Sequence, residues 1–328
     1  DGGVTTLNVT GGSAYDNDDN EYKGSAGIKT GGNFLMRGGI LTITNSGTGG
    51  KGISVDGNGY VNGGTLAITT TGSNYGSSGG NGGGSGWGGN STSSSVSAKG
   101  IKIDGNLAVS GGDITVCSNA HEGIEAKGTI TITNGEVYSY SASDDAINSG
   151  GDFTISGGYV YGRSAGNDGL DANGDFYLKG GVVYAIGTSS PEVAIDANTE
   201  ERHSLYITGG TLIAIGGLEN GTSGNWSQSC YSASSWSQNS WYAMTVDGTT
   251  WAFMTPSSGG TPLVVSGTST PILQSGVSAS NGTSHLEGLL FENPYITGGT
   301  IVSLSSYTGG NGGGGGGGGN GPGGGGPF

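Results

Sequence analysis

Residues 99–120 read KGIKIDGNLAVSGGDITVCSNA, and the next segments of the chain repeat their pattern. The following copies are HEGIEAKGTITITNGEVYSYSAS from His121, DDAINSGGDFTISGGYVYGRSAG from Asp144 and DGLDANGDFYLKGGVVYAIG from Asp168. The aliphatic residue of the opening step falls at Ile101, Ile124, Ile147 and Leu170, at a constant spacing of 23 residues. A fixed period of this size is typical of a solenoid, in which each repeat packs only on its neighbours.

Within each copy the hydrophobic residues alternate with polar ones. In the first copy the alternating residues are Leu107, Val109, Ile114 and Val116. Alternation predicts strands with one buried face, and the Gly-Gly pair between them predicts a corner. A coil of 23 residues at about 3.3 Å each has a perimeter near 76 Å, enough for three short strands and three turns. The sequence therefore predicts an all-β protein, a parallel β-helix, whose hand the crossover rule sets as right.

The composition limits the class of protein and its partners. Only 32% of the 328 residues are hydrophobic and 76 are glycine, which would suggest disorder if the repeats were not present. The net charge of −15 disfavours nucleic acid and favours a cation as a partner. The chain contains no stretch of about 20 apolar residues, so the sequence predicts no membrane-spanning segment. Few lysines, many Ser, Thr, Asn and Gly, and the sequon at Asn8 are typical of a secreted or bacterial cell-surface protein.

The repeat pattern predicts one β-helix over residues 1–307. Earlier copies place their corners at Gly11-Gly12, Gly38-Gly39 and Gly63-Gly64, and PYITGGTIVSL restores the pattern near the end. Two stretches, 72–95 and 217–242, are predicted surface insertions, and residues 243–292 alternate loosely enough to continue as degenerate coils. The tail, 308–328, is too rich in glycine to build a core. If the tail is ordered, either a groove on its own chain or a neighbouring subunit holds it, and we expect the neighbouring subunit.

Acidic and amide residues recur at equivalent positions of successive copies. The candidate metal ligands are Glu122, Glu125, Asp144, Asp145, Asn148, Asn167, Asp168, Asp171 and Asp196. Equivalent positions stack about 4.8 Å apart in a parallel β-helix, so these carboxylates repel one another unless cations lie between them. Carboxylate and amide oxygens are the ligands that Ca²⁺ takes. The alternative is a solvated ladder of turns, in which Asp and Asn are favoured by the backbone geometry.

A second acidic cluster contains Asp16, Asp18 and Glu21. Its spacing is similar to that of Ca²⁺ loops, but it lacks the glycine and the distal glutamate of an EF-hand. The cluster is either a second Ca²⁺ site or a solvated loop.

In the earlier copies lysines take the place of the acidic residues. Lys51 and Lys99 precede the aliphatic residue, and Lys102 follows it. A lysine beside a Ca²⁺-bound uronate is the arrangement with which a polysaccharide lyase removes a proton. The interpretation we favour is that these lysines neutralise the end of the acidic column. The three histidines fall at different coil positions and predict neither a triad nor a zinc site.

The second insertion is rich in aromatic residues. The candidate carbohydrate-binding residues are Trp226, Tyr231, Trp236 and Trp241. Sugar rings stack on such side chains through their apolar face. Equally, these rings could cover the solenoid core or a subunit interface.

Cys117 and Cys230 are either bridged or two separate thiols.

The repeats resemble a bacterial family of carbohydrate-binding domains, secreted parallel β-helices that bind Ca²⁺ and acidic plant polysaccharide. The matching segments are KGIKIDGNLAVSGGDITV, EGIEAKGTITI, DDAINSGGDFTISGGYVY and DGLDANGDFYLKGG, and the resemblance covers about residues 24–217. The family is similar to pectate lyases in architecture but binds rather than cleaves. The resemblance implies that Glu122, Glu125, Asp145, Asp168 and Asp171 hold Ca²⁺. It does not extend to the aromatic insertion or the glycine tail.

Three functional hypotheses follow. The first is an extracellular, non-catalytic β-helix that binds Ca²⁺ and an acidic polysaccharide, polyuronates included. The second is a subunit of a surface filament or sheath, a homo-oligomer joined end to end, because neither terminus shows a capping helix and open strand edges pair with other chains. The third is a Ca²⁺-dependent polysaccharide lyase.

Overall fold

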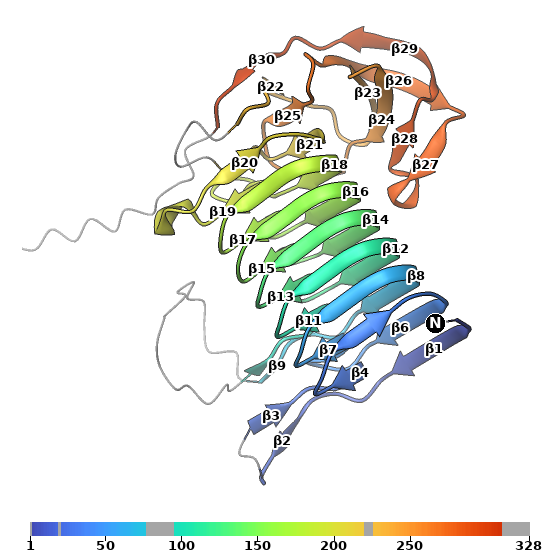
Figure 1. The fold of residues 1–328 in the computed structure, drawn as a ribbon, viewed down its shortest axis with the longest axis vertical. Helices are drawn as coiled ribbons and strands as arrows, with labels where there is room; N and C mark the ends of the chain where they lie inside the picture. Colours follow the sequence, from blue (N-terminus) through green and yellow to red (C-terminus); the bar gives the residue numbers. More distant parts are fainter. Residues whose placement is uncertain (1, 19–20, 77–94, 220–225, 310–328) are drawn as a thin grey trace, which may run out of the picture.

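The computed structural model describes residues 2–18, 21–76, 95–219 and 226–309, and they form a stack of β-coils with a separate sheet at one end (Figure 1). The only helical elements in these ranges are two 3₁₀ turns, η1 (Thr199–Glu201) and η2 (Leu286–Gly288). None of the helices within them has the length and hydrophobicity needed to span a membrane. The predicted all-β parallel solenoid is therefore confirmed.

Two parallel sheets run along the stack. The longer strands are β1 (Val4–Val9), β6 (Ile40–Asn45), β8 (Gly59–Thr70), β12 (Leu107–Ser118), β14 (Ile130–Ser141), β16 (Phe153–Ser164), β18 (Phe176–Ile186) and β21 (Thr211–Ile215), with β5 (Phe34–Met36) beside β8 and β20 (Leu205–Ile207) beside β18. The shorter strands are β4 (Ala26–Thr30), β7 (Lys51–Val55), β11 (Ile101–Ile103), β13 (Ile124–Ala126), β15 (Ile147–Ser149), β17 (Leu170–Ala172) and β19 (Ile195–Ala197).

The register of the shorter strands confirms the repeat. Ile101 pairs with Ile124, Ile124 with Ile147, and Ile147 with Leu170, each one coil apart. Inside the coils the same register stacks apolar side chains into columns, among them Val109, Ile132, Ile155, Leu178 and Ile207, all at most 2% exposed. The alternation of the sequence thus becomes a continuous core. The right-handed sense of the coil stays a prediction.

Strands β8, β12, β14, β16 and β18 each bend at a pair of residues in the middle, which is Gly-Gly in four of them and Asn134-Gly135 in β14. The second residue of the pair has a positive φ, 91° at Gly112 and 94° at Gly135. A Cβ added to Gly135 would lie 2.6 Å from the backbone oxygen of Gly112 on the preceding coil. Glycine is required here because of both the left-handed backbone and the close approach of two coils. The bend divides the long strand into two legs, so each coil has three straight segments.

The first corner differs from its predicted position. Val4 pairs with Ile40, which places Gly2-Gly3, and not Gly11-Gly12, at the corner level with Gly38-Gly39. The chain then leaves the coil and forms a small antiparallel hairpin of β2 (Ala14–Asp16) and β3 (Glu21–Lys23). Leu7 and Val9 lie between Gly2-Gly3 and Gly11-Gly12, so the alternation in the sequence was compatible with a corner at either pair.

The prediction that coils continue through residues 243–292 is wrong. β25 (Leu263–Ser266) pairs antiparallel with β21, and β22 (Cys230–Ala233) and β30 (Ser305–Tyr307) extend that sheet. A second, six-stranded antiparallel sheet contains β23 (Trp241–Val246), β24 (Thr249–Met254), β26 (Ile272–Ser280), β27 (Thr283–His285), β28 (Leu290–Glu292) and β29 (Tyr295–Ile301).

The change from parallel coils to antiparallel strands has a local cause. Asp247 and Gly248, with φ of 55° and 79°, form a two-residue turn between β23 and β24. Asp-Gly between alternating segments is a strong hairpin signal, and it is incompatible with the crossover that a coil needs. The Gly298-Gly299 pair is likewise no coil corner, because it lies within the antiparallel strand β29. The β-helix therefore ends earlier than predicted.

The six-stranded sheet packs on the outward face of the last coils. Its core contains Tyr161 and Tyr184 from the coils together with Phe253 and Leu273 from the sheet. Turn η2 contacts an earlier coil, where Glu136 accepts hydrogen bonds from His285 Nδ1 at 2.5 Å and from the Leu286 amide at 3.0 Å. The C-terminal segments thus cover the side and the end of the stack.

Both predicted insertions are only partly described. Residues 72–95 begin and end in a short hairpin of β9 (Tyr75–Gly76) and β10 (Ser95–Val96), whereas 77–94 lie outside the described residues. Residues 220–225 of the second insertion and 310–328 of the tail also lie outside them, and so does the predicted contact of the tail with a neighbour. Cys117 and Cys230 are separate free thiols, which rules out the disulfide alternative.

Candidate functional site

Two columns of polar side chains follow the seven-stranded sheet. The strand column consists of the residues just after the paired aliphatics, namely Lys29, Ser54, Lys102, Glu125, Asn148, Asp171 and Asp196. The turn column lies two residues before those aliphatics and consists of Lys51, Lys99, Glu122, Asp145 and Asp168. Parallel pairing places successive members about 4.8 Å apart. The stacking of the predicted ligands on one face of the solenoid is thus present in the structure.

One further member of the strand column, Glu219, is absent from the predicted ligands. Leu218 forms a parallel bridge with Ile195, which places Glu219 next to Asp196. Glu219 is 4% exposed, and its carboxylate accepts hydrogen bonds from the Thr199 hydroxyl at 2.5 Å and from the Ala197 amide at 3.2 Å. The sequence carried a signal for it, since Gly217-Leu218-Glu219 repeats the glycine–aliphatic–acid step of the coils.

Charge changes sign along both columns, and Lys99 lies at the boundary. Its Nζ is 3.0 Å from Glu122 Oε2 and 2.7 Å from Glu125 Oε2. Burial favours the neutral amine, but the charges of Glu122 and Glu125 outweigh it and raise the pKa of Lys99. Two of the predicted Ca²⁺ ligands, Glu122 and Glu125, are therefore already neutralised by a lysine, as the simpler interpretation of the lysines expected.

His121 extends this neutralised region by one coil. Its Nδ1 lies 2.7 Å from Asp144 Oδ2 and also contacts Glu122. Burial opposes the charged imidazole, but hydrogen bonds to Asp144 and Glu122 raise the pKa of His121 to about 9. Burial likewise opposes the charge of Asp144, yet His121 and the amide of Asn167, 3.1 Å away, bring the pKa of Asp144 to about 2. A protonated His121 therefore takes the place that a cation would have between these carboxylates.

Substitution of His121 should alter the pH dependence of stability. Its folded pKa of about 9 exceeds the ordinary 6.5, so its stabilising contribution is complete below 6.5 and is lost as the pH rises through 9. We expect His121→Gln to lower the free energy of unfolding at pH 6 by about 1–2 kcal/mol, less than the full shift implies because the imidazole is partly open to solvent.

The measurement is denaturant unfolding at several pH values. The difference between wild type and His121→Gln should shrink as the pH approaches 9. The more exposed His203, 3.5 Å from Asp175, is the matched control, and His203→Gln should follow the wild type. Parallel profiles for wild type and His121→Gln would contradict the assignment.

The acidic half of the columns has no such cation. Asp145 and Asp168 are 5% and 6% exposed, and in the described part of the chain no lysine, arginine or histidine lies within 4.0 Å of their carboxylates or of those of Asp171 and Asp196. Burial and then the charge of Asp144 raise the pKa of Asp145 to about 7. Burial, followed by the charge of Asp145, also raises the pKa values of Asp168 and Asp171 well above their ordinary range.

Asp196 continues this group. Burial and a hydrogen bond shared with Glu219 raise the pKa of Asp196 to about 11. A carboxyl that stays protonated far above its usual pKa shows that negative charge is strongly disfavoured at this place. The acidic half thus contains more buried carboxylates than its surroundings can stabilise as anions.

The acidic half offers oxygen donors of the kind that Ca²⁺ takes. The amide of Asn148 donates to Asp145 Oδ2 at 3.0 Å and to Asp171 Oδ2 at 2.6 Å, so three oxygen-bearing side chains meet at one point. With the amide turned over, Asn148 Oδ1 would join the two carboxylates as a ligand of a hard cation. Among the described residues, the close groupings of three His or acidic ligand atoms are elsewhere, at His121, Glu122 and Asp144 and at Asp152, Asp175 and His203. The carboxylates around Asn148 do not form such a close grouping, and a cation bound there would draw Asp145 and Asp171 inward.

The second acidic cluster is held by Lys23. Its Nζ lies 2.8 Å from Asp16 Oδ2 and 3.8 Å from Glu21 Oε1. The Asp18 amide donates to Asp16 Oδ1 at 3.0 Å, as in a solvated turn. Asp19 and Asn20 lie outside the described residues, and a Ca²⁺ site at this loop stays a prediction.

The aromatic residues of the second insertion do not form a common platform. The indole of Trp226 donates to the Leu205 oxygen at 3.0 Å and stacks on Tyr307, and that of Trp236 donates to the Gly260 oxygen at 2.9 Å. Trp241 packs against Phe291. Tyr231 lies apart, with its hydroxyl 3.2 Å from the Thr270 hydroxyl. These contacts agree with the alternative that the rings cover the core, and a sugar-binding role for them stays a prediction.

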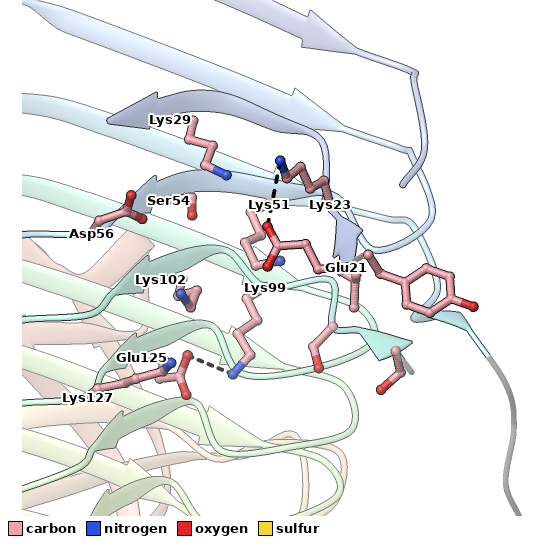
Figure 2. Close-up of a pocket in the computed structure, with 15 residues that line it drawn as sticks. Glu21, Lys23, Lys29, Lys51, Ser54, Asp56, Lys99, Lys102, Glu125 and Lys127 are labelled. Carbon is pink, nitrogen blue, oxygen red and sulfur yellow. Dashed lines mark ion pairs between the residues drawn. The ribbon is translucent and has the colours of Figure 1, made fainter. Parts of the chain in front are cut away.

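A pocket of about 360 Å³ lies over the basic half of the columns (Figure 2). Its cationic lining residues are Lys23, Lys29, Lys51, Lys99, Lys102 and Lys127. Glu21, Asp56 and Glu125 are the acidic ones. The repeats single out three of these lysines but not the pocket, because β3, β4, β7, β11 and the turn after β13 contribute to it together. Aligning Ile28 with Ile53 would have placed Lys29 in the strand column.

The fold and this charged face define a parallel β-solenoid with a polar binding surface along one sheet. Over residues 1–146 the chain matches a family model described as "Carbohydrate-binding domain-containing protein", which confirms the resemblance for that part of the chain. The matched part includes every lysine of the pocket and Asp145, but not Asp168, Asp171 or Asp196. Neither a search of curated proteins nor one of solved structures gave a significant match.

Proposed function

We propose that this chain is a secreted, non-catalytic β-helix protein that binds Ca²⁺ and an acidic polysaccharide at the bacterial surface. The observation that carries the proposal is the acidic half of the columns, where Asp145 and Asp168 are buried and Asp171 is half-buried, all without a cationic partner in the described residues. A divalent cation would offset their repulsion and retain unfilled coordination positions. The carboxylates of an acidic glycan are suitable ligands for those positions. The match of residues 1–146 supports carbohydrate as the partner.

Calorimetric titration with CaCl₂ tests the metal. We expect saturable binding to the wild type and at least a tenfold loss of affinity in Asp168→Asn/Asp171→Asn. Asp113→Asn is the matched control, because Asp113 is exposed and lies on β12, in the other parallel sheet. Equal affinities in all three proteins, or none in the wild type, would overturn the metal assignment.

Retention on an immobilised polyuronate, with and without Ca²⁺, then tests the glycan. We expect retention of the wild type to strengthen with Ca²⁺ and no unsaturated sugar to be released. Release of unsaturated product would instead support the lyase alternative. Equal behaviour on a neutral glycan would contradict an acidic partner.

The filament alternative is supported by one edge of the stack. Among the described residues β1 pairs on one side only, and Val4 and Ile40 beside it are 73% and 45% exposed. At the other end the antiparallel strand β25 covers β21, so coils of two molecules cannot simply continue one another there. Sedimentation velocity should therefore show a monomer at micromolar concentration, and concentration-dependent growth would favour the filament.

A further inference from the structure

We infer that the lysine pocket is a Ca²⁺-independent subsite for the carboxylate groups of a polyuronate, with Lys29 and Lys51 as its principal contacts. This inference rests on the proposed function for the class of glycan. It adds a site distinct from the acidic half of the columns and gives the basic half a role in recognition.

The first argument is the gathering of positive charge. The chain has a net charge of −15 and seven lysines, and six of the seven line this one pocket. They belong to neighbouring coils and to the adjoining β2–β3 hairpin, so the fold and not the local sequence collects them (Figure 2). In a strongly acidic protein such a group produces a local positive field that attracts anions.

The second argument is the distribution of partners within the pocket. Lys99 is paired with Glu122 and Glu125. Lys102 and Lys127 share Asp104 at 2.7 Å and 2.9 Å, and Lys23 is paired with Asp16 and Glu21. Lys29 and Lys51, in contrast, have no carboxylate within 4.0 Å among the residues that the structure describes. Two ammonium groups thus remain to bind an external anion.

Lys51 is held in an unfavourable state. Burial, and then the charges of Lys102 and Lys99, lower its pKa to about 8. A partly buried lysine beside other lysines destabilises the fold, and such arrangements concentrate at functional sites. A bound carboxylate would reverse this effect because it supplies the missing opposite charge.

The third argument concerns the chemistry of the ligand. The pocket volume is near the lower limit of ligand pockets, about 300–1,000 Å³, and suits one or two sugar units. Its cations are all lysines, which act as point charges, whereas arginine is the residue that recognises phosphate through paired hydrogen bonds. Glu21, Asp56 and Glu125 at its walls would repel a dense polyanion. The hydroxyls of Ser54 and Ser97 add neutral donors suited to sugar hydroxyls.

Continuity with the acidic half supports the same ligand. The two columns run from Lys29 and Lys51 to Asp168 and Asp171 on one face without a break in strand pairing. A polyuronate lying along that face would meet ammonium groups at one end and carboxylate-bound Ca²⁺ at the other. The ammonium groups and the bound Ca²⁺ both attract carboxylates, so one polyuronate chain would bind to both halves of the columns.

The test is the affinity of oligogalacturonate for the wild type, Lys29→Gln/Lys51→Gln and Lys179→Gln, measured in chelator and again in Ca²⁺. Lys179, the lysine outside the pocket, is exposed and lies over the Tyr177 ring, so it controls for the removal of one positive charge elsewhere on the chain. In chelator we expect the double variant to lose at least tenfold in affinity and Lys179→Gln to stay within about twofold. Equal affinities of the double variant and the control would overturn the inference.

Two further arms identify the ligand. The methyl-esterified oligosaccharide lacks carboxylate charge and should bind at least tenfold more weakly; equal binding would overturn the inference. A sulfated glycan tests the other source of anionic groups, and a higher affinity for it than for oligogalacturonate would overturn the assignment to uronate. Loss of Ca²⁺ dependence with retained lysine dependence would refute the proposed metal site while leaving this subsite intact.

Stability supplies an independent readout. Because Lys51 is destabilised by burial and by its neighbours, Lys51→Gln should raise the midpoint of thermal unfolding by a few degrees while weakening oligogalacturonate binding. A simultaneous fall in midpoint and affinity would show that Lys51 is structural and would overturn its assigned role.

Discussion

Removing Ca²⁺ with a chelator is expected to lower the midpoint of thermal unfolding by about 10 °C, and acidification from pH 7 to pH 5 should restore part of the loss. An ion present at a thousand times its dissociation constant adds about 4 kcal/mol to the free energy of unfolding. In domains of 150–250 residues each kcal/mol of unfolding free energy shifts the midpoint by about 2–4 °C, so the loss of this energy corresponds to about 10 °C.

The response to acid follows from the direction of the pKa shifts. The folded pKa of Asp145 is about 7, whereas its ordinary value is 3.8, so the folded state binds this proton more tightly. Its contribution to stability is absent above pH 7, grows as the pH falls through 7 and is complete near 4. Asp168 and Asp171 are shifted in the same direction. In chelator the protein should therefore become more stable between pH 7 and pH 5, and with Ca²⁺ bound this gain should disappear.

The matched variant is Asp145→Asn/Asp168→Asn. Its amides carry no charge to neutralise, so neither chelator nor acidification to pH 5 should change its midpoint much. It should also exceed the wild type in stability when both are in chelator at pH 7. A wild type and variant that respond to chelator alike would show that these aspartates only form a ladder of turns.

The second large effect is expected at the corner of the coil. Gly135→Ala should lower the free energy of unfolding by about 2–4 kcal/mol, because φ is 94° there and the new Cβ would lie 2.6 Å from the Gly112 oxygen. Neither backbone can move away without breaking the pairing of β12 with β14. Denaturant unfolding of the purified variant measures the loss.

Gly151→Ala is the control. Gly151 has no positive φ, and a Cβ there would approach no atom more closely than 3.5 Å. Its substitution should change the free energy of unfolding by less than about 1 kcal/mol. If both variants lost the same amount, general glycine entropy and not the corner geometry would be the cause.

Much of the fold could be predicted because its signals are local and periodic. Ile101, Ile124, Ile147 and Leu170 occupy one position of a repeating unit, and each copy contains its own alternation and its own corner glycine. In a solenoid every repeat contacts only its neighbours, so the spacing in sequence gives the register in space. The same spacing is sufficient to place Asp145, Asp168 and Asp171 on one face of the solenoid.

Prediction was wrong where two local patterns competed. Residues 243–292 alternate like coil strands, but the Asp247-Gly248 turn folds them back into antiparallel hairpins. Near the N-terminus Leu7 and Val9 lie between two Gly-Gly pairs, and only pairing with β6 selects Gly2-Gly3 as the corner. Alternation reports a buried face but not the direction of the neighbouring strand.

The sequence by itself therefore determined the coil, its period, its glycine corners and the stacking of polar residues in columns. Only the tertiary structure decided how those charges are divided. It pairs Lys99 with Glu122 and Glu125, places a protonated His121 beside Asp144, and leaves Asp145 and Asp168 without a cation and Lys29 and Lys51 without an anion among the described residues. The physical reason is that column membership depends on the repeat, whereas ion pairing and desolvation depend on distances of a few ångströms between side chains of different coils.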